Sequence, residues 1–291
     1  MPLASLIEWK QSKYAVTFIT AGPGGKTQRG GGGKRMSLVQ KKVEGKIGTI
    51  AFDHYEKRNA LGSELIAEVV GALHEFRAQG VRAVVLRSAC KGNVWSAGHD
   101  VTELPKADVD PLPYTDPFEQ LLRAVKKFPA PVIAMIHGTV WGGACDLVMN
   151  CDLVFGDETC TFAITPAKLG LPYNAGGFLT FMTRLPLAIV KEMFFTSEPI
   201  TAERAERVGI VNAIVPSEQL EERVYETARV ICRRSAAAIA AFKEAMRVLS
   251  EAVAINPATY EYLQSLRRDV YFGSDYREGI QAFLDKRPAK F

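Results

Sequence analysis

Hydrophobic residues change their spacing several times along the chain, and the changes indicate where strands and helices alternate. Short apolar runs predict strands at residues 39–43, 47–52, 82–87, 131–136 and 153–156. The first two runs flank Glu44-Gly45-Lys46, which predicts a hairpin. The other three predict buried strands of a sheet.

Helical spacing appears between these strands. The apolar residues from Leu65 to Phe76 recur every three or four positions, which predicts a helix with Ser63 as its N-cap and Gly80 as its stop. A second helix is expected over residues 143–150. Strands that alternate with helices are typical of a mainly parallel sheet, so we predict an α/β fold.

The pattern becomes helical throughout beyond Pro216. Helices are expected at residues 220–233, 236–251, 257–269 and 275–285. We therefore predict an α/β core over residues 36–215, followed by a helical C-terminal region over residues 216–291. This region is expected to pack on the core or on a neighbouring subunit.

Residues 1–35 differ from the rest of the chain in composition. They contain six basic side chains and one acidic one, with glycines concentrated in the second half. We interpret them as a disordered, basic, Gly-rich extension upstream of Met36. The whole chain carries a net charge of +4, so the remainder carries −1. That remainder has no bulk attraction to nucleic acid or to an anionic membrane.

The cysteines and the apolar runs bear on the cellular compartment of the protein. The chain has five cysteines and no Cys-x-x-Cys pair, which favours reduced thiols over disulfides or a zinc site. No apolar run reaches the length of a membrane span, and we recognise no secretory signal. We expect a cytoplasmic protein that binds no metal.

Two glycine-containing segments carry the candidate chemistry. Small residues in Trp95-Ser96-Ala97-Gly98-His99-Asp100 would let a ligand approach the backbone closely. In the segment from His137 to Ala144, the pair Gly142-Gly143 follows a predicted strand and opens a predicted helix, where N–H groups are exposed. Each segment follows a core strand, so both could converge on one carbonyl oxygen.

Three motifs in series resemble a known family. They are Lys57-Arg58-Asn59-Ala60-Leu61, Ser96-Ala97-Gly98-His99-Asp100 and His137-Gly138-x-x-x-Gly142-Gly143, and their order is similar to the enoyl-CoA hydratase/isomerase (crotonase) superfamily. The likeness covers about residues 39–287. It implies a spiral of ββα units, a homotrimer or dimer of trimers, and an acyl-CoA substrate in a cleft. It also implies an oxyanion hole formed by the N–H groups of His99 and Gly143.

The same resemblance implies where coenzyme A is bound. Its contacts would fall on Lys57, Arg58, Ala60, Ala97, Gly98, Asp100, Val101 and Lys286. Lys286 would meet phosphate groups of a CoA in its own or an adjacent subunit; a solvated basic tail is the alternative. Coenzyme A enters as part of the substrate, so no separate cofactor is expected.

The positions of the catalytic acids distinguish branches of the family. Hydratases of this family use two glutamates, and here those positions hold Asp146 and Pro166. Proline cannot transfer a proton, which disfavours hydration. The surroundings of Pro166 and Tyr173 resemble instead the branch that decarboxylates methylmalonyl-CoA to propionyl-CoA without metal, biotin or cobalamin. That branch implies that Tyr173 orients the substrate carboxylate and that Thr165 lines the same pocket.

Several alternatives stay open at this point. Tyr173 could be a half-buried aromatic whose hydroxyl reaches water, and Thr165 an ordinary turn residue. For Asp146 we favour a charge that complements the helix dipole over one that handles protons, and for Trp141 we favour packing over a wall of the acyl pocket. The protein could also be a hydratase, isomerase or hydrolase with Asp146 as its lone acid. A non-catalytic RNA-binding protein that uses the basic arm is a hypothesis of another class.

Overall fold

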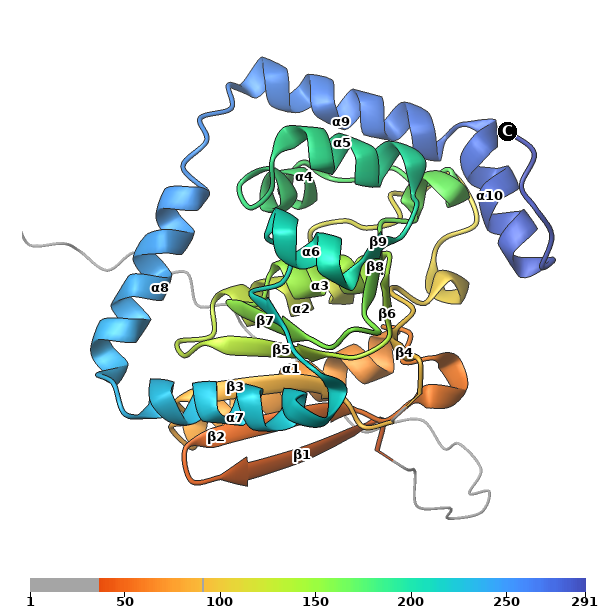
Figure 1. Cartoon of the computed structure of the whole chain (residues 1–291). Coiled ribbons are helices and arrows are strands. Elements are labelled where there is room, and N and C mark those ends of the chain that lie inside the picture. Colours follow the sequence, from red (N-terminus) through yellow and green to blue (C-terminus); the bar gives the residue numbers. More distant parts are fainter. Residues whose placement is uncertain (1–36, 91) are drawn as a thin grey trace, which may run out of the picture. The chain divides into compact units, whose positions relative to one another are not determined.

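The described strands form two β-sheets (Figure 1). The computed structural model describes residues 37–90 and 92–291. In this part of the chain one sheet has the order β1-β2-β3-β5-β7-β10 and the other has the order β4-β6-β8-β9. The strands are β1 (Val39–Glu44), β2 (Ile47–Phe52), β3 (Ala83–Ser88), β4 (Val94–Ser96), β5 (Val132–Ile136), β6 (Thr139–Trp141), β7 (Leu153–Gly156), β8 (Thr161–Ala163), β9 (Ile200–Thr201) and β10 (Ala213–Ile214).

The helices lie between the strands and, beyond β10, follow one another to the end of the chain. They are α1 (Ser63–Ala78), α2 (Pro117–Lys126), α3 (Gly143–Met149), α4 (Ala175–Met182), α5 (Leu187–Thr196), α6 (Ala202–Val208), α7 (Ser217–Cys232), α8 (Ala236–Ser250), α9 (Pro257–Tyr271) and α10 (Ser274–Leu284), with short 3-10 turns η1 (Tyr55–Lys57), η2 (Val101–Glu103) and η3 (Pro166–Leu169). Three successive units, β3-β4-α2, β5-β6-α3 and β7-β8-α4, each add one strand to each sheet. The expectation of repeated ββα units is therefore confirmed.

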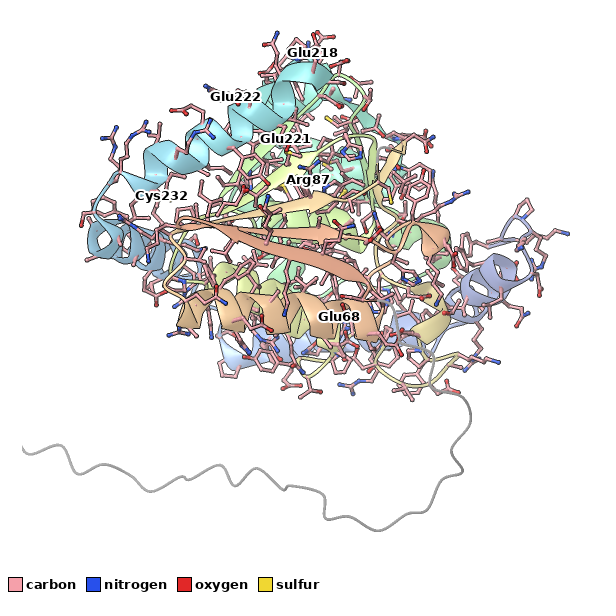
Figure 2. All side chains as sticks on the ribbon, turned by 90° about the horizontal axis from the view of Figure 1, so that it is seen from below. Glu68, Arg87, Glu218, Glu221, Glu222 and Cys232 are labelled. Atoms are coloured by element: carbon pink, nitrogen blue, oxygen red, sulfur yellow. The ribbon has the colours of Figure 1, made fainter. Side chains whose placement is uncertain are left out.

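The central strands of the six-stranded sheet are buried on both faces. Along β3, Val84 and Leu86 belong to the larger core that includes α1, whereas Ala83 and Val85 join the smaller core under α7. Alternate residues of a strand point to opposite faces, so one apolar run packs against both helices. Figure 2 shows α7 on one face of the sheet and α1 on the other. Strands β2, β3, β5, β7 and β10 pair in parallel, which confirms the predicted mainly parallel sheet.

Most of the predicted elements are confirmed, and one end is corrected. Gly80 has a left-handed φ of +66° just beyond α1, as expected of a stop. The cap prediction was wrong, because Gly62 is the N-cap of α1 and Ser63 is its first residue. The Ser63 hydroxyl instead donates to Glu103 Oε2 at 2.6 Å. The short strands of the second sheet were not predicted.

The four C-terminal helices are α7 to α10, as the periodicity predicted. Helix α8 is anchored by Lys243, whose buried Nζ donates to Asp152 Oδ2 at 2.6 Å and to the carbonyls of Val125 and Ala130. Helix α10 packs on η3, near the end of the chain (Figure 1). The expected homotrimer or dimer of trimers and the division of the chain at residue 215 stay predictions. The extension predicted over residues 1–35, with the RNA-binding hypothesis that depends on it, lies outside the described residues.

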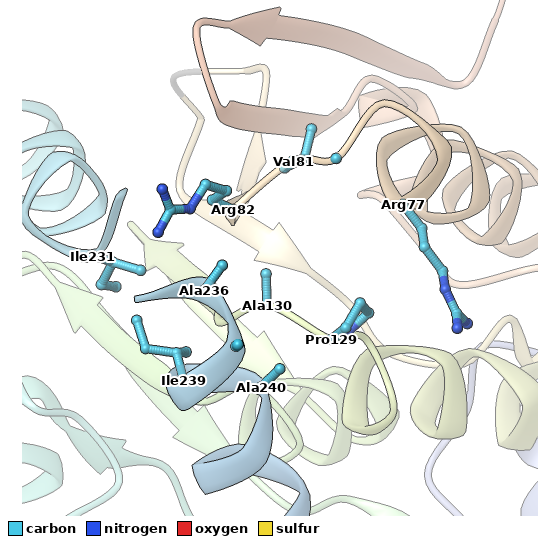
Figure 3. A pocket seen from close by; sticks show the side chains of 11 residues that line it. Arg77, Val81, Arg82, Pro129, Ala130, Ile231, Ala236, Ile239 and Ala240 are labelled. Carbon is cyan, nitrogen blue, oxygen red and sulfur yellow. The ribbon is translucent and has the colours of Figure 1, made fainter. Parts of the chain in front are cut away.

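Other features of the described residues bear on the function. No helix among them is long and apolar enough to cross a membrane. None of the five cysteines forms a disulfide. A pocket of about 320 Å³ lies where α8 begins (Figure 3). It is lined by Arg77, Gly80, Val81, Arg82, Pro129, Ala130, Ile231, Ala236, Ala237, Ile239 and Ala240. These groups include no acid, hydroxyl or thiol, so this pocket holds no candidate nucleophile or carboxylate.

The packing of α10 on η3 gives a test of the fold. A Cβ built on Gly279 would lie 2.1 Å from the carbonyl oxygen of Leu169, so only glycine lets α10 approach η3 this closely. We expect Gly279→Ala to lower the free energy of unfolding by about 1–3 kcal/mol, the usual cost of overpacking. Gly71→Ala is the matched control, because Gly71 lies within α1 and has nothing within 4 Å of its Cβ position.

We expect the control substitution to raise the free energy of unfolding by about 0.5–1 kcal/mol, since alanine is the better helix former. Denaturant unfolding of both variants measures the difference. Equal stabilities of the two variants would contradict the close packing of α10.

Candidate active site

One edge of the four-stranded sheet gathers the residues that the sequence singled out. Strands β4, β6 and β8 are neighbours and run parallel, so their C-terminal ends meet at the same edge. Residues 97–100 leave β4, Gly142 and Gly143 leave β6, and Thr165 follows β8. Segments far apart in the sequence therefore meet because each ββα unit contributes one short strand.

Glycine lets two of these segments approach each other. Gly98 has a φ of +91°, and a Cβ there would lie 2.3 Å from the Trp141 carbonyl oxygen and 2.9 Å from Gly143 N. A Cβ on Gly143 would lie 3.2 Å from His99 N. Across residues 37–90 and 92–291, no acceptor is hydrogen-bonded to the N–H of His99 or Gly143. Two unpaired amides thus lie close together, as the oxyanion-hole hypothesis requires.

The side chain of His99 is held by its neighbours. Nδ1 lies 3.1 Å from the Asp100 carbonyl oxygen, and Nε2 lies 3.9 Å from Asp116 Oδ1. The ring packs edge-to-face on Phe118, with 5.6 Å between the ring centroids. Asp116 also caps α2 by accepting from Phe118 N. The imidazole therefore fixes the segment after β4 against the start of α2, which leaves the main-chain N–H as the available donor.

Thr165 lies beside the same amides. Its Oγ1 would be 2.9 Å from a Cβ on Gly142, which has a φ of +54°. The Gly142 N–H donates to the Ala163 carbonyl at 2.8 Å, which links the end of β6 to the end of β8. The structure thus brings Thr165 together with His99 and Gly143.

The segment from Lys57 to Leu61 runs along the end of β4. Ala97 N donates to the Arg58 carbonyl at 3.0 Å, and Leu61 N donates to the Gly98 carbonyl at 2.7 Å. Lys57 Nζ lies 3.1 Å from Asp100 Oδ2 and stays largely exposed. The predicted CoA contacts Lys57, Arg58, Ala60, Ala97, Gly98, Asp100 and Val101 therefore lie in two adjoining segments. Burial favours a higher pKa for Asp100, but hydrogen bonds from Thr102 and Lys57 outweigh it and hold the pKa below its usual value.

Asn59 supports this arrangement, and the sequence reasoning gave it no role. It is buried, with a φ of +50°, and its Nδ2 donates to Ser88 Oγ and to the Trp95 carbonyl. Its position inside the Lys-Arg-Asn-Ala-Leu motif was the available signal. Lys286, in contrast, follows α10, and its side chain makes no hydrogen bond or ion pair with the described residues.

A carboxyl–phenol pair adjoins the amides. The Tyr173 hydroxyl donates to Asp146 Oδ2, and Asp146 sits on α3, three residues after Gly143. Burial raises the pKa of Asp146 to about 7, and the charge of Glu119 adds to this, while the Tyr173 bond and Lys126 oppose it. Burial and the adjacent carboxylate also hold the pKa of Tyr173 well above its usual value.

This pair bears on the alternatives for Asp146 and Tyr173. Asp146 lies in the first turn of α3, as the dipole interpretation requires, but it is also buried and bonded to Tyr173. Tyr173 is half-buried, its hydroxyl donates to Asp146, and its ring packs against Phe178, Phe181 and Phe194. Trp141 was expected mainly to pack, but it is 40% exposed.

A pocket of about 440 Å³ borders Asp146. Its wall includes Glu119 and Lys126 from α2, Asn174 at the start of α4, and Arg267 from α9. Asn174 Nδ2 donates to Glu119 Oε1 at 2.5 Å. The sequence reasoning did not find Glu119, because no motif marks it and only the fold brings α2 against α3 and α4.

Comparison with known proteins identifies the family. The family model described as Enoyl-CoA hydratase/isomerase matches residues 42–291. The chain therefore belongs to the enoyl-CoA hydratase/isomerase family, the crotonase superfamily. It is 43% identical over 246 residues to "Methylmalonyl-CoA decarboxylase" of Escherichia coli (strain K12), covering 84% of this chain and 94% of that protein.

Solved structures of such a decarboxylase are also similar. The structure titled "Methylmalonyl-CoA decarboxylase in complex with 2-nitronate-propionyl-CoA" superposes with a TM-score of 0.86 at 42% identity, covering 87% of this chain and 98% of that one. A second, complexed with 2S-carboxypropyl CoA, gives a TM-score of 0.86 at 41% identity, covering 88% and 98%. The predicted α/β crotonase fold with a helical C-terminal region is confirmed.

The raised pKa of Asp146 predicts how stability depends on pH. Between the ordinary value of 3.8 and about 7, the folded state holds a proton on Asp146 that the unfolded state has lost. The contribution of this group to the free energy of unfolding therefore falls as the pH rises through that interval. Asp146→Asn cannot titrate, so we expect its free energy of unfolding to rise relative to the wild type from about pH 4 to pH 7. Urea unfolding at a series of pH values measures this, and a pH-independent difference would contradict a raised pKa.

Proposed function

We propose that the protein decarboxylates methylmalonyl-CoA to propionyl-CoA through an enolate bound to the main-chain N–H groups of His99 and Gly143. The observation that carries the proposal is the adjacency of these two unpaired amides at the edge that also holds Thr165. The 43% identity to a methylmalonyl-CoA decarboxylase supports the choice of reaction. The proposed enzyme class is a carboxy-lyase.

The chemistry needs few groups from the protein. The bond between the α-carbon and the carboxylate breaks, and its electron pair enters the thioester carbonyl to give an enolate. This step needs no base, but it needs the breaking bond perpendicular to the thioester plane and the enolate oxygen stabilised. Two fixed N–H donors supply that stabilisation without reorganisation. The products are CO₂ and, once the α-carbon takes a proton, propionyl-CoA.

Tyr173 and Thr165 are proposed to orient the carboxylate that leaves. With a pKa of about 7, Asp146 is in part protonated near neutral pH. A protonated Asp146 can donate to the Tyr173 oxygen, which frees the phenolic O–H to point at the substrate carboxylate. The hydrogen bond between them therefore supports a donor that adapts when the substrate arrives. Thr165 Oγ1, beside Gly142, would complete the pocket.

The rest of the substrate is proposed to follow the two segments beside β4. Main-chain groups of Ala97, Gly98 and Val101, with Lys57, Arg58 and Ala60, would contact coenzyme A. Lys286 would reach a phosphate group of a CoA bound to an adjacent subunit. The proposed assembly is a homotrimer or dimer of trimers, and exposed apolar side chains are available for it on α8 and α9, among them Phe242, Met246, Leu249, Tyr262 and Leu266.

A second candidate is a hydratase, isomerase or hydrolase of the same fold. The buried Asp146, with its pKa of about 7, favours it, since general acids and bases work best near their pKa. The second acid of a hydratase is missing, because Pro166 begins η3 at that position. A lone acid suits proton transfer better than the addition of water.

The reaction is tested with a panel of CoA esters and no added metal or cofactor. We expect CO₂ and propionyl-CoA from methylmalonyl-CoA, with both epimers assayed separately and with malonyl-CoA and ethylmalonyl-CoA as comparisons. Crotonyl-CoA tests the second candidate in the same experiment. Rapid hydration of crotonyl-CoA without CO₂ release from any carboxyacyl-CoA would refute the decarboxylase.

The amide pair is tested by Gly143→Ala. The added methyl would lie 3.2 Å from His99 N and 2.9 Å from the end of the Phe118 ring, which can shift. Because the methyl crowds the enolate oxygen, we expect kcat/KM to fall about 100-fold. Gly71→Ala in α1 is the control and should retain full activity. Wild-type kcat/KM in a folded Gly143→Ala protein would exclude the proposed oxyanion hole.

A further inference from the structure

Decarboxylation consumes one proton, and the pocket beside Asp146 bears on where that proton comes from. Once CO₂ has left, the enolate carbon must be protonated before propionyl-CoA is complete. The amides of His99 and Gly143 stabilise the oxygen and supply no proton. A bound acyl-CoA would also cover the side from which water could otherwise approach.

Asp146 contacts Tyr173 on one side and the pocket on the other. Oδ2 accepts from Tyr173, while Oδ1 is buried and has no hydrogen-bond partner among the described residues. Asp146 is only 5% exposed, yet it forms part of the wall of the 440 Å³ pocket. His99, Gly143, Thr165 and Tyr173 are not among the lining residues, so a substrate held at the amides leaves this pocket open. A buried carboxyl oxygen without a hydrogen-bond partner is energetically costly, which indicates a functional role.

Glu119 is the acid that shares this pocket with Asp146. It comes from α2 and accepts from Asn174 Nδ2, with Arg123 Nη1 3.7 Å from its other oxygen. Its charge acts on both Asp146 and Tyr173, so the three groups form one electrostatic cluster. Burial also raises the pKa of Glu119 above its usual value, against the hydrogen bond from Asn174 and the charges of Arg123 and Arg267. The other charged groups of the wall are Asp110, Lys126, Lys127, Arg247 and Glu251.

We propose that this pocket is the proton inlet of the active site, with Glu119 relaying protons from solvent to the Asp146–Tyr173 pair. The inference rests on the proposed decarboxylase and extends it. The hydroxyl of Tyr173, which held the carboxylate, is left facing the same carbon after CO₂ departs. It gives its proton to that carbon and takes one from the Asp146 carboxylic acid. Asp146 is then reprotonated from Glu119 and the water of the pocket, so one solvent proton is consumed for each CO₂ released.

Glu119→Gln tests the inlet, with Glu251→Gln as the matched control. The control makes the same change in a residue of the same pocket that is half-exposed and pairs with Lys126 and Arg247. We expect Glu119→Gln to lower kcat about tenfold with little change in KM, because proton delivery follows substrate binding. The control should keep the wild-type kcat. Formate is small enough to enter the pocket and should restore much of the lost turnover, whereas chloride at equal ionic strength should not.

A second measurement separates this inference from the proposed reaction. Exchange of the α-hydrogens of propionyl-CoA in D₂O, followed by NMR, needs the inlet and the amides but no departing CO₂. Wild-type exchange that Glu119→Gln slows about tenfold and formate restores would support the inlet even if no carboxyacyl-CoA were decarboxylated. Decarboxylation and exchange at wild-type rates in Glu119→Gln would overturn the inlet and leave the decarboxylase intact. Loss of activity that formate cannot restore would show a structural role and would also overturn it.

Discussion

The site depends on the close approach of two stretches of backbone. Where β4 and β6 end, the chain beyond one strand comes so near the chain beyond the other that a single Cβ at Gly98 would meet a carbonyl oxygen and an amide nitrogen. Everything else at this edge is arranged around that approach. Asn59 ties the segment after η1 to β4, and the ring of His99 ties the segment after β4 to α2. Backbone amides positioned in this way need no side chain to carry the charge of an enolate.

Burial then determines what the neighbouring side chains do. In water Asp146 would be an ordinary carboxylate, but the protein removes it from solvent and gives it one phenol as a partner. Desolvation disfavours the charged form of both groups, so near neutral pH Tyr173 keeps its proton and Asp146 is in part protonated. For the proposed carboxylate-bearing substrate this matters, because the pair is neutral when Asp146 is protonated and then does not repel the carboxylate.

The sequence predicted the fold well where an apolar run or a helical periodicity extended over enough residues. Apolar runs such as Val84 to Leu86 marked the buried strands, and the periodicity of α7 to α10 marked the C-terminal helices. The strands β4, β6 and β8 have three residues each, too few to show a period, so the second sheet was missed. The motifs placed His99 and Gly143 together through the resemblance. Nothing local could reveal the burial of Asp146 or the approach of Glu119, because both follow from how α2, α3 and α4 pack.

The alternation of strands between two sheets separates the tasks of the site. The amide of His99 follows the second strand of one repeat and that of Gly143 follows the second strand of the next, while Thr165 and Tyr173 lie between β8 and α4 of the third. The amides proposed to bind the enolate and the side chains proposed to orient the leaving carboxylate therefore belong to different units of the chain. Substitutions in the third unit, such as an acid for the proline or a smaller residue for the tyrosine, would leave the amides of His99 and Gly143 in place. One scaffold can in this way acquire new reactions while it keeps the same intermediate.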